Sequence, residues 1–143
     1  MKKLKVIAAA GLFGAALISA SAYAVPPTNV TGLIGTWVNT NPNDKGIIKV
    51  VVTPTWWGGI TFKSYGSCSP TPCVHTTVSA QTFSASVSSN TAVGFTAYRN
   101  SGFKTARFSG QRYGSYLRLD SFNTFASGDS RKNYSATDYF KKQ

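Results

Sequence analysis

Short runs of alternating apolar and polar residues follow one another along most of the chain, separated by clusters of turn-forming residues. A two-residue alternation is typical of β-strands that bury one face, and these runs are rich in Val, Thr, Tyr and Phe, which favour strands. Eight strands are predicted, at residues 35–40, 46–53, 60–65, 74–83, 91–99, 103–112, 116–125 and 132–140. No helix is expected among them.

The connections between these runs are too short for crossover helices, so neighbouring strands should pair antiparallel. An up-and-down meander of eight strands closes into a barrel and thereby leaves no exposed edge. Residues 41–46 are dense in turn formers, and Gly46 is expected to take the positive φ that ends this turn. The pattern predicts an all-β, eight-stranded antiparallel up-and-down β-barrel in a single domain, residues 25–143.

The apolar positions also assign a face to the residues of several strands. Inward-facing positions are predicted for Ile48, Val50, Val52, Val93, Phe95, Ala97, Ala106, Phe108, Leu117 and Leu119. Tyr98, Arg107 and Arg118 then lie on the outer surface of neighbouring strands. The last strand is ambiguous, because one of its faces combines Tyr134, Ala136, Asp138 and Phe140.

The first 24 residues differ from the rest in composition. Lys2, Lys3 and Lys5 precede a run of apolar and small residues, and the tripeptide Ala-Tyr-Ala that ends at Ala24 matches a signal-peptide cleavage site. The apolar run is shorter than the roughly 20 residues that span a membrane. The segment is expected to be a secretory signal peptide cleaved near Ala24, which places a domain of 119 residues in the periplasm or the medium.

Beyond Ala24 the chain has four Asp and no Glu, and its net charge is about +8. A basic excess on an exported protein favours contact with anionic surfaces such as envelope polymers, acidic polysaccharide or nucleic acid. The same charges also keep a β-rich surface soluble without any partner. Both interpretations remain open from composition alone.

Two cysteines, Cys68 and Cys73, enclose the residues Ser-Pro-Thr-Pro. In the oxidising environment of an exported protein a disulfide between them is expected, and so short a loop gives it the role of fixing a hairpin tip. The alternative is a metal site of Cys68, Cys73 and His75. Structural zinc sites use closer cysteine pairs and four ligands, and the chain has no second histidine. No metal and no cofactor are therefore predicted.

The residue patterns of common enzyme classes are absent from the sequence. There is no Gly-x-Ser-x-Gly, no His-Glu-x-x-His and no glycine-rich phosphate loop. Asp120 and Asp138 form a candidate carboxylate pair for acid–base chemistry, but salt bridges to Arg118 and Arg107, or a role as plain surface charges, explain them better. The protein is predicted not to be an enzyme.

Gly35-Thr-Trp37 opens the first strand, and Asn39 follows two residues after the tryptophan. This stretch resembles the Gly-x-Trp signature of lipocalins and, more closely, the Gly-Thr-Trp-x-Asn of avidins, both calycin-like barrels. The resemblance implies that Asn39 contacts a ligand, as the matching asparagine of avidins contacts biotin. Avidins enclose biotin with later tryptophans, whereas this chain has none after Trp57, so biotin is not the expected ligand. Lipocalins pack a late arginine over the first-strand tryptophan, a role to which the sequence assigns no residue.

A broader resemblance links the chain to small exported bacterial β-domains that combine a Gly-Thr-Trp-Val-Asn start with a Cys-x-Pro-Thr-Pro-Cys loop. That resemblance implies no particular activity.

Trp37 and Asn39 face the same side of the first strand, while Trp56 and Trp57 lie in a loop rich in Pro and Gly. Trp37 either fills one end of the barrel or lines a ligand site, and Asn39 needs hydrogen-bond partners from the protein or from a ligand. The loop tryptophans either bind a ligand or cover a barrel mouth. The leading hypothesis is a non-catalytic protein that holds a small apolar or amphipathic ligand at a barrel mouth. In it Trp37 lines the base, Asn39 is the polar anchor, and Trp56 and Trp57 gate access.

The later strands carry a set of aromatic and basic residues, namely Tyr98, Arg99, Arg107, Arg112, Tyr113 and Arg118. Aromatic stacking together with phosphate contact is typical of single-strand nucleic-acid binding, although no nucleic-acid motif occurs. The second hypothesis is therefore a cationic surface module. Its partner would be anionic polysaccharide, envelope polymer or nucleic acid, bound through Arg99, Arg107, Arg112 and Arg118.

Overall fold

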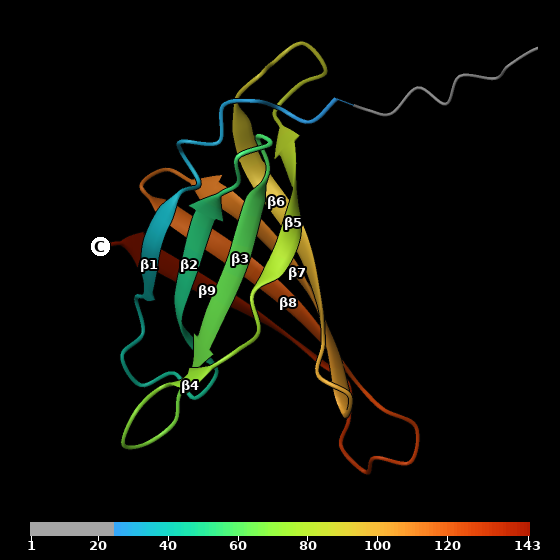
Figure 1. Cartoon of the computed structure of the whole chain (residues 1–143). Helices are drawn as coiled ribbons and strands as arrows, with labels where there is room; N and C mark the ends of the chain where they lie inside the picture. The colour runs from blue at the N-terminus through green and yellow to red at the C-terminus, as the bar shows by residue number, and fades with distance from the viewer. Residues whose placement is uncertain (1–24) are drawn as a thin grey trace, which may run out of the picture.

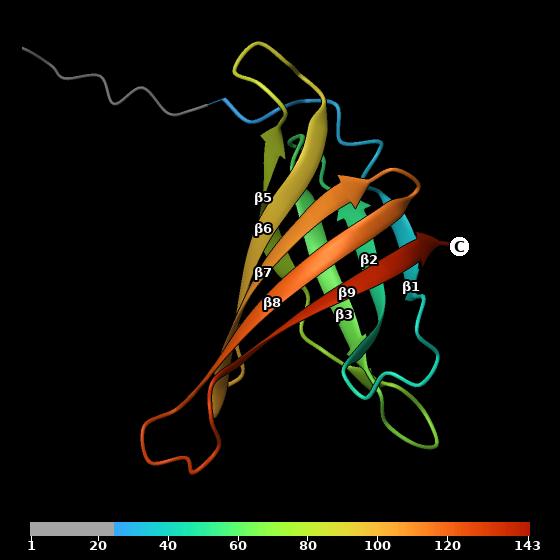
Figure 2. The same ribbon diagram turned by 180° about the vertical axis from the view of Figure 1, so that it is seen from behind.

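The computed structural model describes residues 25–143, and the predicted signal peptide lies outside the described residues. These residues form nine β-strands and no helix (Figures 1 and 2). The strands are β1 (Gly35–Asn39), β2 (Ile47–Pro54), β3 (Ile60–Gly66), β4 (Cys73–Val74), β5 (Val78–Ser84), β6 (Ala92–Asn100), β7 (Lys104–Tyr113), β8 (Tyr116–Phe125) and β9 (Tyr134–Lys142). Within this part of the chain no helix is long and apolar enough to span a bilayer.

Eight of the strands close into an antiparallel barrel in the order β1, β2, β3, β5, β6, β7, β8 and β9, and β9 pairs back onto β1. The predicted eight-stranded up-and-down barrel is thus confirmed. The two-residue β4 pairs only with the end of β3. The predicted strand at residues 74–83 is wrong in its first half, because the chain leaves the sheet after Val74 and rejoins it at Val78.

The predicted disulfide between Cys68 and Cys73 is present, with the two Cα atoms 5.3 Å apart. It closes the loop between β3 and β4, as expected for a staple at a hairpin tip. Each sulfur is bonded to the other, so in this structure neither cysteine is free to join His75 as a metal ligand.

The predicted inward positions of β7 and β8, with Phe95 and Ala97 of β6, belong to the core, where Phe62 of β3 packs against Phe95 and Phe108 with ring centroids 5.5 and 4.8 Å away. The prediction for Val93 is wrong, because a register shift in the β5–β6 pairing puts Ala92 in the core and leaves Val93 half-buried beside an outer hollow. In β2 the prediction for Ile48 is wrong. A register shift between Ile47 and Lys49 in the pairing with β3 marks a bulge. Ile47 consequently faces the barrel interior, while Ile48 lines an outer hollow.

Gly46 does not take the predicted positive φ. The loop between β1 and β2 is held instead by the side chain of Asp44, whose Oδ1 accepts a hydrogen bond from the Gly46 backbone N–H at 2.6 Å.

The segment before β1 plugs one end of the barrel. Asn29 bridges to Thr91 at the start of β6, and Val30 and Leu33 are buried in the core. We call this the closed end; it lies at the top of Figure 1 and also holds the β2–β3 and β7–β8 turns. The opposite end, which holds the β1–β2, β6–β7 and β8–β9 connections and the disulfide loop, is the open end.

Candidate functional site

Trp37 belongs to the closed end and is 0 % exposed. Its Nε1 donates to the carbonyl oxygen of Leu33 at 3.0 Å. The guanidinium carbon of Arg112 lies 5.4 Å from its ring centroid, and Arg112 also donates to the carbonyl oxygens of Gly32 and Gly114. Trp37 therefore fills the barrel end, which was one of the two roles considered for it. An arginine does pack over this tryptophan, although the sequence assigned none.

Trp56 and Trp57 occupy the β2–β3 turn, also at the closed end. Trp56 is 92 % exposed and Trp57 is largely exposed, and their rings meet edge to face with centroids 5.4 Å apart. Asn39 lies at the other end of the barrel, because β1 runs away from this turn. The prediction that these tryptophans gate a site anchored by Asn39 is wrong.

Asn39 is buried, and all of its hydrogen-bonding groups are used within the protein. Its Nδ2 donates to Asp44 Oδ2 at 2.7 Å and to the Ile47 carbonyl oxygen at 2.8 Å, while its Oδ1 accepts from the Asn41 backbone N–H at 2.8 Å. The side chain therefore shapes the β1–β2 loop. These contacts account for the side chain within the protein, and a ligand contact of Asn39 stays a prediction.

A cavity of about 300 Å³ lies inside the open end, and we call it the cup. Ile47 and Phe108 contribute apolar wall to it. Most of its lining is polar or charged, including Asp44, His75, Arg99, Lys104, Ser121, Asn123, Tyr134 and Asp138. The face of β9 that the sequence left ambiguous thus points inward, and it brings two of these polar groups into the barrel.

Arg99 is the most informative residue of the cup. It is only 6 % exposed, so the prediction that it belongs to a cationic outer surface is wrong. Its Nη1 donates to Ser64 Oγ at 2.7 Å, and its guanidinium carbon lies 5.2 Å from the ring centroid of Phe108. Its Nε–H has no partner among residues 25–143. The missed signal was the two-residue period of β6, which places Arg99 on the same face as Phe95 and Ala97.

No carboxylate neutralises Arg99 in the described part of the chain. The ion pairs found within residues 25–143 join Arg118 to Asp120 and Arg131 to Asp129. Burial lowers the pKa of Arg99, but a guanidinium keeps its proton in proteins. The cup therefore contains a buried guanidinium that makes no salt bridge within residues 25–143, although the carboxyl groups of Asp44 and Asp138 line the same cavity.

Ser64 connects Arg99 to His75. An arginine has only donors, so the Ser64 oxygen accepts from Arg99 and donates its own proton to His75 Nδ1 at 2.8 Å. This arrangement assigns the imidazole proton to Nε2. Burial and the positive charges of Arg99 and Lys104 lower the pKa of His75 to about 4. At neutral pH the positive charge of this side of the cup thus comes from Arg99 and Lys104.

Asp44 and Asp138 form a carboxyl pair on the other side of the cup. Burial, together with the hydrogen bond and the negative charge of Asp44, raises the pKa of Asp138 to about 6. Burial tends to raise the pKa of Asp44 as well, but hydrogen bonds from the Gly46 backbone and from the side chains of Asp138 and Asn39 lower it overall. The pair therefore holds one proton between its two carboxyl groups in mildly acidic solution.

These shifts predict opposing pH dependences of stability. Between pH 3.8 and about 6 the folded state retains a proton on Asp138 that the unfolded state has lost, so this group makes the protein less stable as pH rises. Between about pH 4 and 6.5 the unfolded state binds a proton on His75 that the folded state does not, so this group makes the protein more stable as pH rises.

We therefore expect the free energy of unfolding of Asp138→Asn to rise as the pH increases from 4 to 6.5. The free energy of unfolding of His75→Asn should fall over the same range. Each change should be on the order of 1 kcal/mol, because both groups are partly screened by solvent. Urea unfolding at several pH values measures the pH dependence of the free energy of unfolding for each protein. The slope for the wild type should lie between the slopes for the two variants. Parallel curves for the two variants would contradict the assignment.

The four arginines predicted as one cationic surface are dispersed. Arg99 is inside the barrel and Arg112 is tied to the closed end. Arg118 pairs with Asp120 on the outer face, with Nη2 and Oδ1 3.1 Å apart. Of the four, Arg107 alone is both exposed and free of a carboxylate partner within residues 25–143.

Comparison of the chain with protein-family models and with curated proteins gives no match, so the functional argument rests on the geometry of the barrel itself.

Proposed function

We propose that this protein binds a small amphipathic molecule in the cup and holds it by a carboxylate at Arg99. The observation that carries the proposal is the buried guanidinium that forms no salt bridge and leaves its Nε–H without a partner within residues 25–143. Burying a charge without a partner is unfavourable, and a carboxylate is the group that matches the planar donors of arginine. A ligand that supplies this group would satisfy the Nε–H that the protein leaves without a partner.

The rest of the cup suits such a ligand. Lys104 lines the same cavity and adds a second positive charge. Ile47 and Phe108 offer apolar surface for a short hydrocarbon portion, and Asn123 and Tyr134 offer hydrogen-bonding groups. A volume of about 300 Å³ lies at the small end of ligand sites in proteins, which favours a molecule the size of a single ring or a short chain.

The proposed role is non-catalytic, even though Ser64 and His75 are hydrogen-bonded to each other. A serine nucleophile must reach the substrate, whereas Ser64 is fully buried and its oxygen already accepts from Arg99.

Export to the periplasm or the medium is part of the same proposal. The Cys68–Cys73 disulfide supports it, since disulfides persist in oxidising compartments. Native mass spectrometry of the protein purified from its own host tests both points at once. We expect a chain that begins near Val25 and an additional small acidic mass; retention of residues 1–24, or a preparation free of any bound mass, would count against export or binding respectively.

Arg99→Gln is expected to remove the preference of the cup for carboxylates. Benzoate and its uncharged analogue benzamide are a matched pair of probes, followed by NMR shifts of the Ser64, His75 and Asn123 amides. The wild type should bind benzoate at least tenfold more tightly than benzamide, because a charge-assisted hydrogen bond contributes about 1.5–3 kcal/mol. Arg99→Gln should bind both equally, while Arg107→Gln, on the outer surface, should behave as the wild type. Equal binding of both probes by the wild type, or no binding of either, would refute the proposal.

A further inference from the structure

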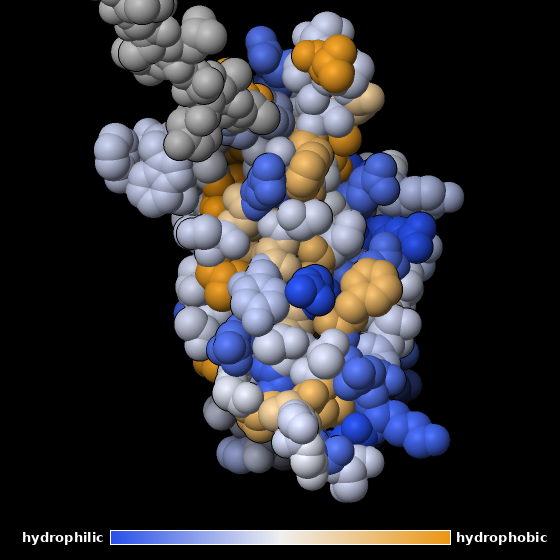
Figure 3. All heavy atoms as spheres, turned by 90° about the vertical axis from the view of Figure 1, so that its right-hand side faces the viewer, coloured by the Kyte–Doolittle hydropathy of each residue, from blue (hydrophilic) through white to orange (hydrophobic). Residues whose placement is uncertain are grey.

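We propose a second binding site, for an acidic oligosaccharide, on the outer face of strands β5–β8, where a carboxylate-bearing sugar is seated at Arg107. The site is separate from the cup, because its exposed side chains point away from the barrel interior. Figure 3 views this side of the molecule and shows hydrophobic side chains gathered beside strongly hydrophilic ones near the middle of the face.

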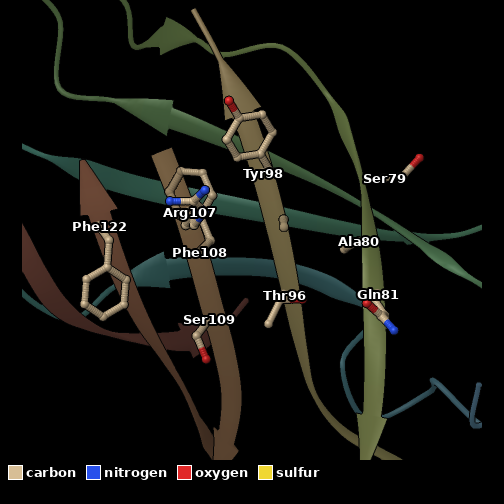
Figure 4. Close-up of a pocket in the computed structure, with 10 residues that line it drawn as sticks. Ser79, Ala80, Gln81, Thr96, Tyr98, Arg107, Phe108, Ser109 and Phe122 are labelled. Atoms are coloured by element: carbon tan, nitrogen blue, oxygen red, sulfur yellow. The ribbon is translucent and has the colours of Figure 1, made fainter. Parts of the chain in front are cut away.

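The groove is formed by two neighbouring hollows. The first has a volume of about 680 Å³ and includes Tyr98, Arg107 and Phe122 (Figure 4). The second, of about 520 Å³, includes Phe83 and Gly94. Both share Thr96 and Ser109 in their lining, so they form one elongated depression along the strands. An elongated groove fits a linear chain molecule better than a compact one.

Tyr98, Arg107 and Phe122 stand in one row across three strands. Arg107 is paired with Tyr98 on one side and with Phe122 on the other, and Figure 4 shows the three side chains next to one another. Tyr98 is 49 % exposed and Phe122 is 56 % exposed. The guanidinium carbon of Arg107 lies 5.8 Å from the Tyr98 ring centroid. The row therefore presents two accessible aromatic faces on either side of a positive charge.

The next row along the strands is polar and uncharged on β5, β6 and β7, and its β8 member is Asp120, which is already paired with Arg118. Gln81, Thr96 and Ser109 are successive partners across β5, β6 and β7, and all three are exposed. Their hydroxyl and amide groups donate and accept hydrogen bonds, as sugar hydroxyls require. The apolar C–H faces of sugar rings pack on aromatic side chains. Phe83 supplies a third aromatic ring in the far part of the groove.

Because the groove has a single cation, it suits an acidic sugar better than a polynucleotide. A strand of nucleic acid carries one phosphate per nucleotide, and its binding proteins track that backbone with several cations. Residues lining the two hollows include Arg107 as their only charged group, and no carboxylate. One arginine matches one acidic sugar flanked by neutral contacts, through paired hydrogen bonds to its carboxylate.

Calorimetric titration of the full-length mature protein tests the site. The acidic probes are tetramers of galacturonate and of mannuronate, the neutral probe is maltotetraose, and a ten-nucleotide thymidine strand represents nucleic acid. We expect at least one uronate tetramer to bind and to be preferred over maltotetraose. Arg107→Gln should weaken uronate binding about ten- to a hundredfold. Phe122→Ala should weaken it about five- to a hundredfold through lost ring contact.

Arg118→Gln is the matched control, because Arg118 lies on the same outer face but is already paired with Asp120. It should bind uronate as the wild type does, and urea unfolding midpoints should show that every variant is folded. The proposal is overturned if neither uronate binds, if Arg107→Gln binds as well as the wild type, or if the thymidine strand binds more tightly than both uronates. Sedimentation of the free protein as a dimer that Phe122→Ala dissociates would also overturn it, since a second copy would then cover the face.

Discussion

Truncating Trp37 to alanine is expected to lower the free energy of unfolding by about 3–5 kcal/mol. The side chain is fully buried at the closed end, and its indole N–H is hydrogen-bonded to Leu33. Its ring contacts two cations, with Arg112 5.4 Å and Lys142 5.5 Å from the centroid. Alanine would leave a large cavity at the point where the N-terminal segment, β1 and the β7–β8 turn meet. Urea unfolding followed by far-UV circular dichroism measures the loss.

Trp56→Ala provides a control with the same chemical change at an exposed position. Trp56 is 92 % exposed, so its truncation should change the free energy of unfolding by no more than about 0.5 kcal/mol. If the two variants were equally stable, the assignment of Trp37 to the closed end would be wrong.

Replacing Arg99 with methionine is expected to raise the free energy of unfolding of the ligand-free protein by about 1–4 kcal/mol. Methionine replaces the unbranched stem of arginine without its guanidinium group, and it adapts to irregular interior space. The substitution removes a buried charge that has no carboxylate partner within residues 25–143, together with one hydrogen bond to Ser64. Desolvation of the charge is the larger effect, so the net change favours the folded state.

The measurement requires protein that has been unfolded and refolded without ligand, because a bound molecule would stabilise the wild type. Arg107→Met is the control, since Arg107 is exposed and its replacement should change stability by less than about 0.5 kcal/mol. A destabilised Arg99→Met protein would show that the guanidinium serves the fold and would remove the main support for a carboxylate site. If Arg99→Met is more stable than the wild type and no longer binds benzoate, Arg99 lowers the stability of the protein but is needed for binding.

The barrel could be predicted from the sequence because a two-residue period reports directly which face of a strand is buried. Ile48 was misplaced because a bulge shifts the period by one residue, and nothing in the local sequence marks the bulge. The inward position of Arg99 was available from the same period. The positive charge of Arg99 favoured a surface position, whereas its two-residue spacing from Phe95 and Ala97 correctly indicates the interior.

The error of placing Asn39, Trp56 and Trp57 at one site has a different origin. Successive connections of an up-and-down barrel alternate between its two ends, so the loop after β1 and the loop after β2 lie far apart. Contacts between side chains that meet only when the barrel closes could not be predicted from the sequence, because the sequence pattern does not report which distant residues become neighbours. Arg112 reaches Trp37, and Asp44 reaches Asp138, only after strands remote in sequence have come together.

The seam between β9 and β1 has a consequence for how the molecule forms. Val38 pairs with Lys141 and Asn39 with Phe140, residues about one hundred positions apart. Every other junction of the ring joins strands that are neighbours along the chain or nearly so. Because loop closure over such a distance is entropically unfavourable, the seam should be among the last contacts to form. Until it does, β1 and β9 each present an open edge that another chain can pair with. The period of greatest exposure to aggregation therefore lasts until the β9–β1 seam closes.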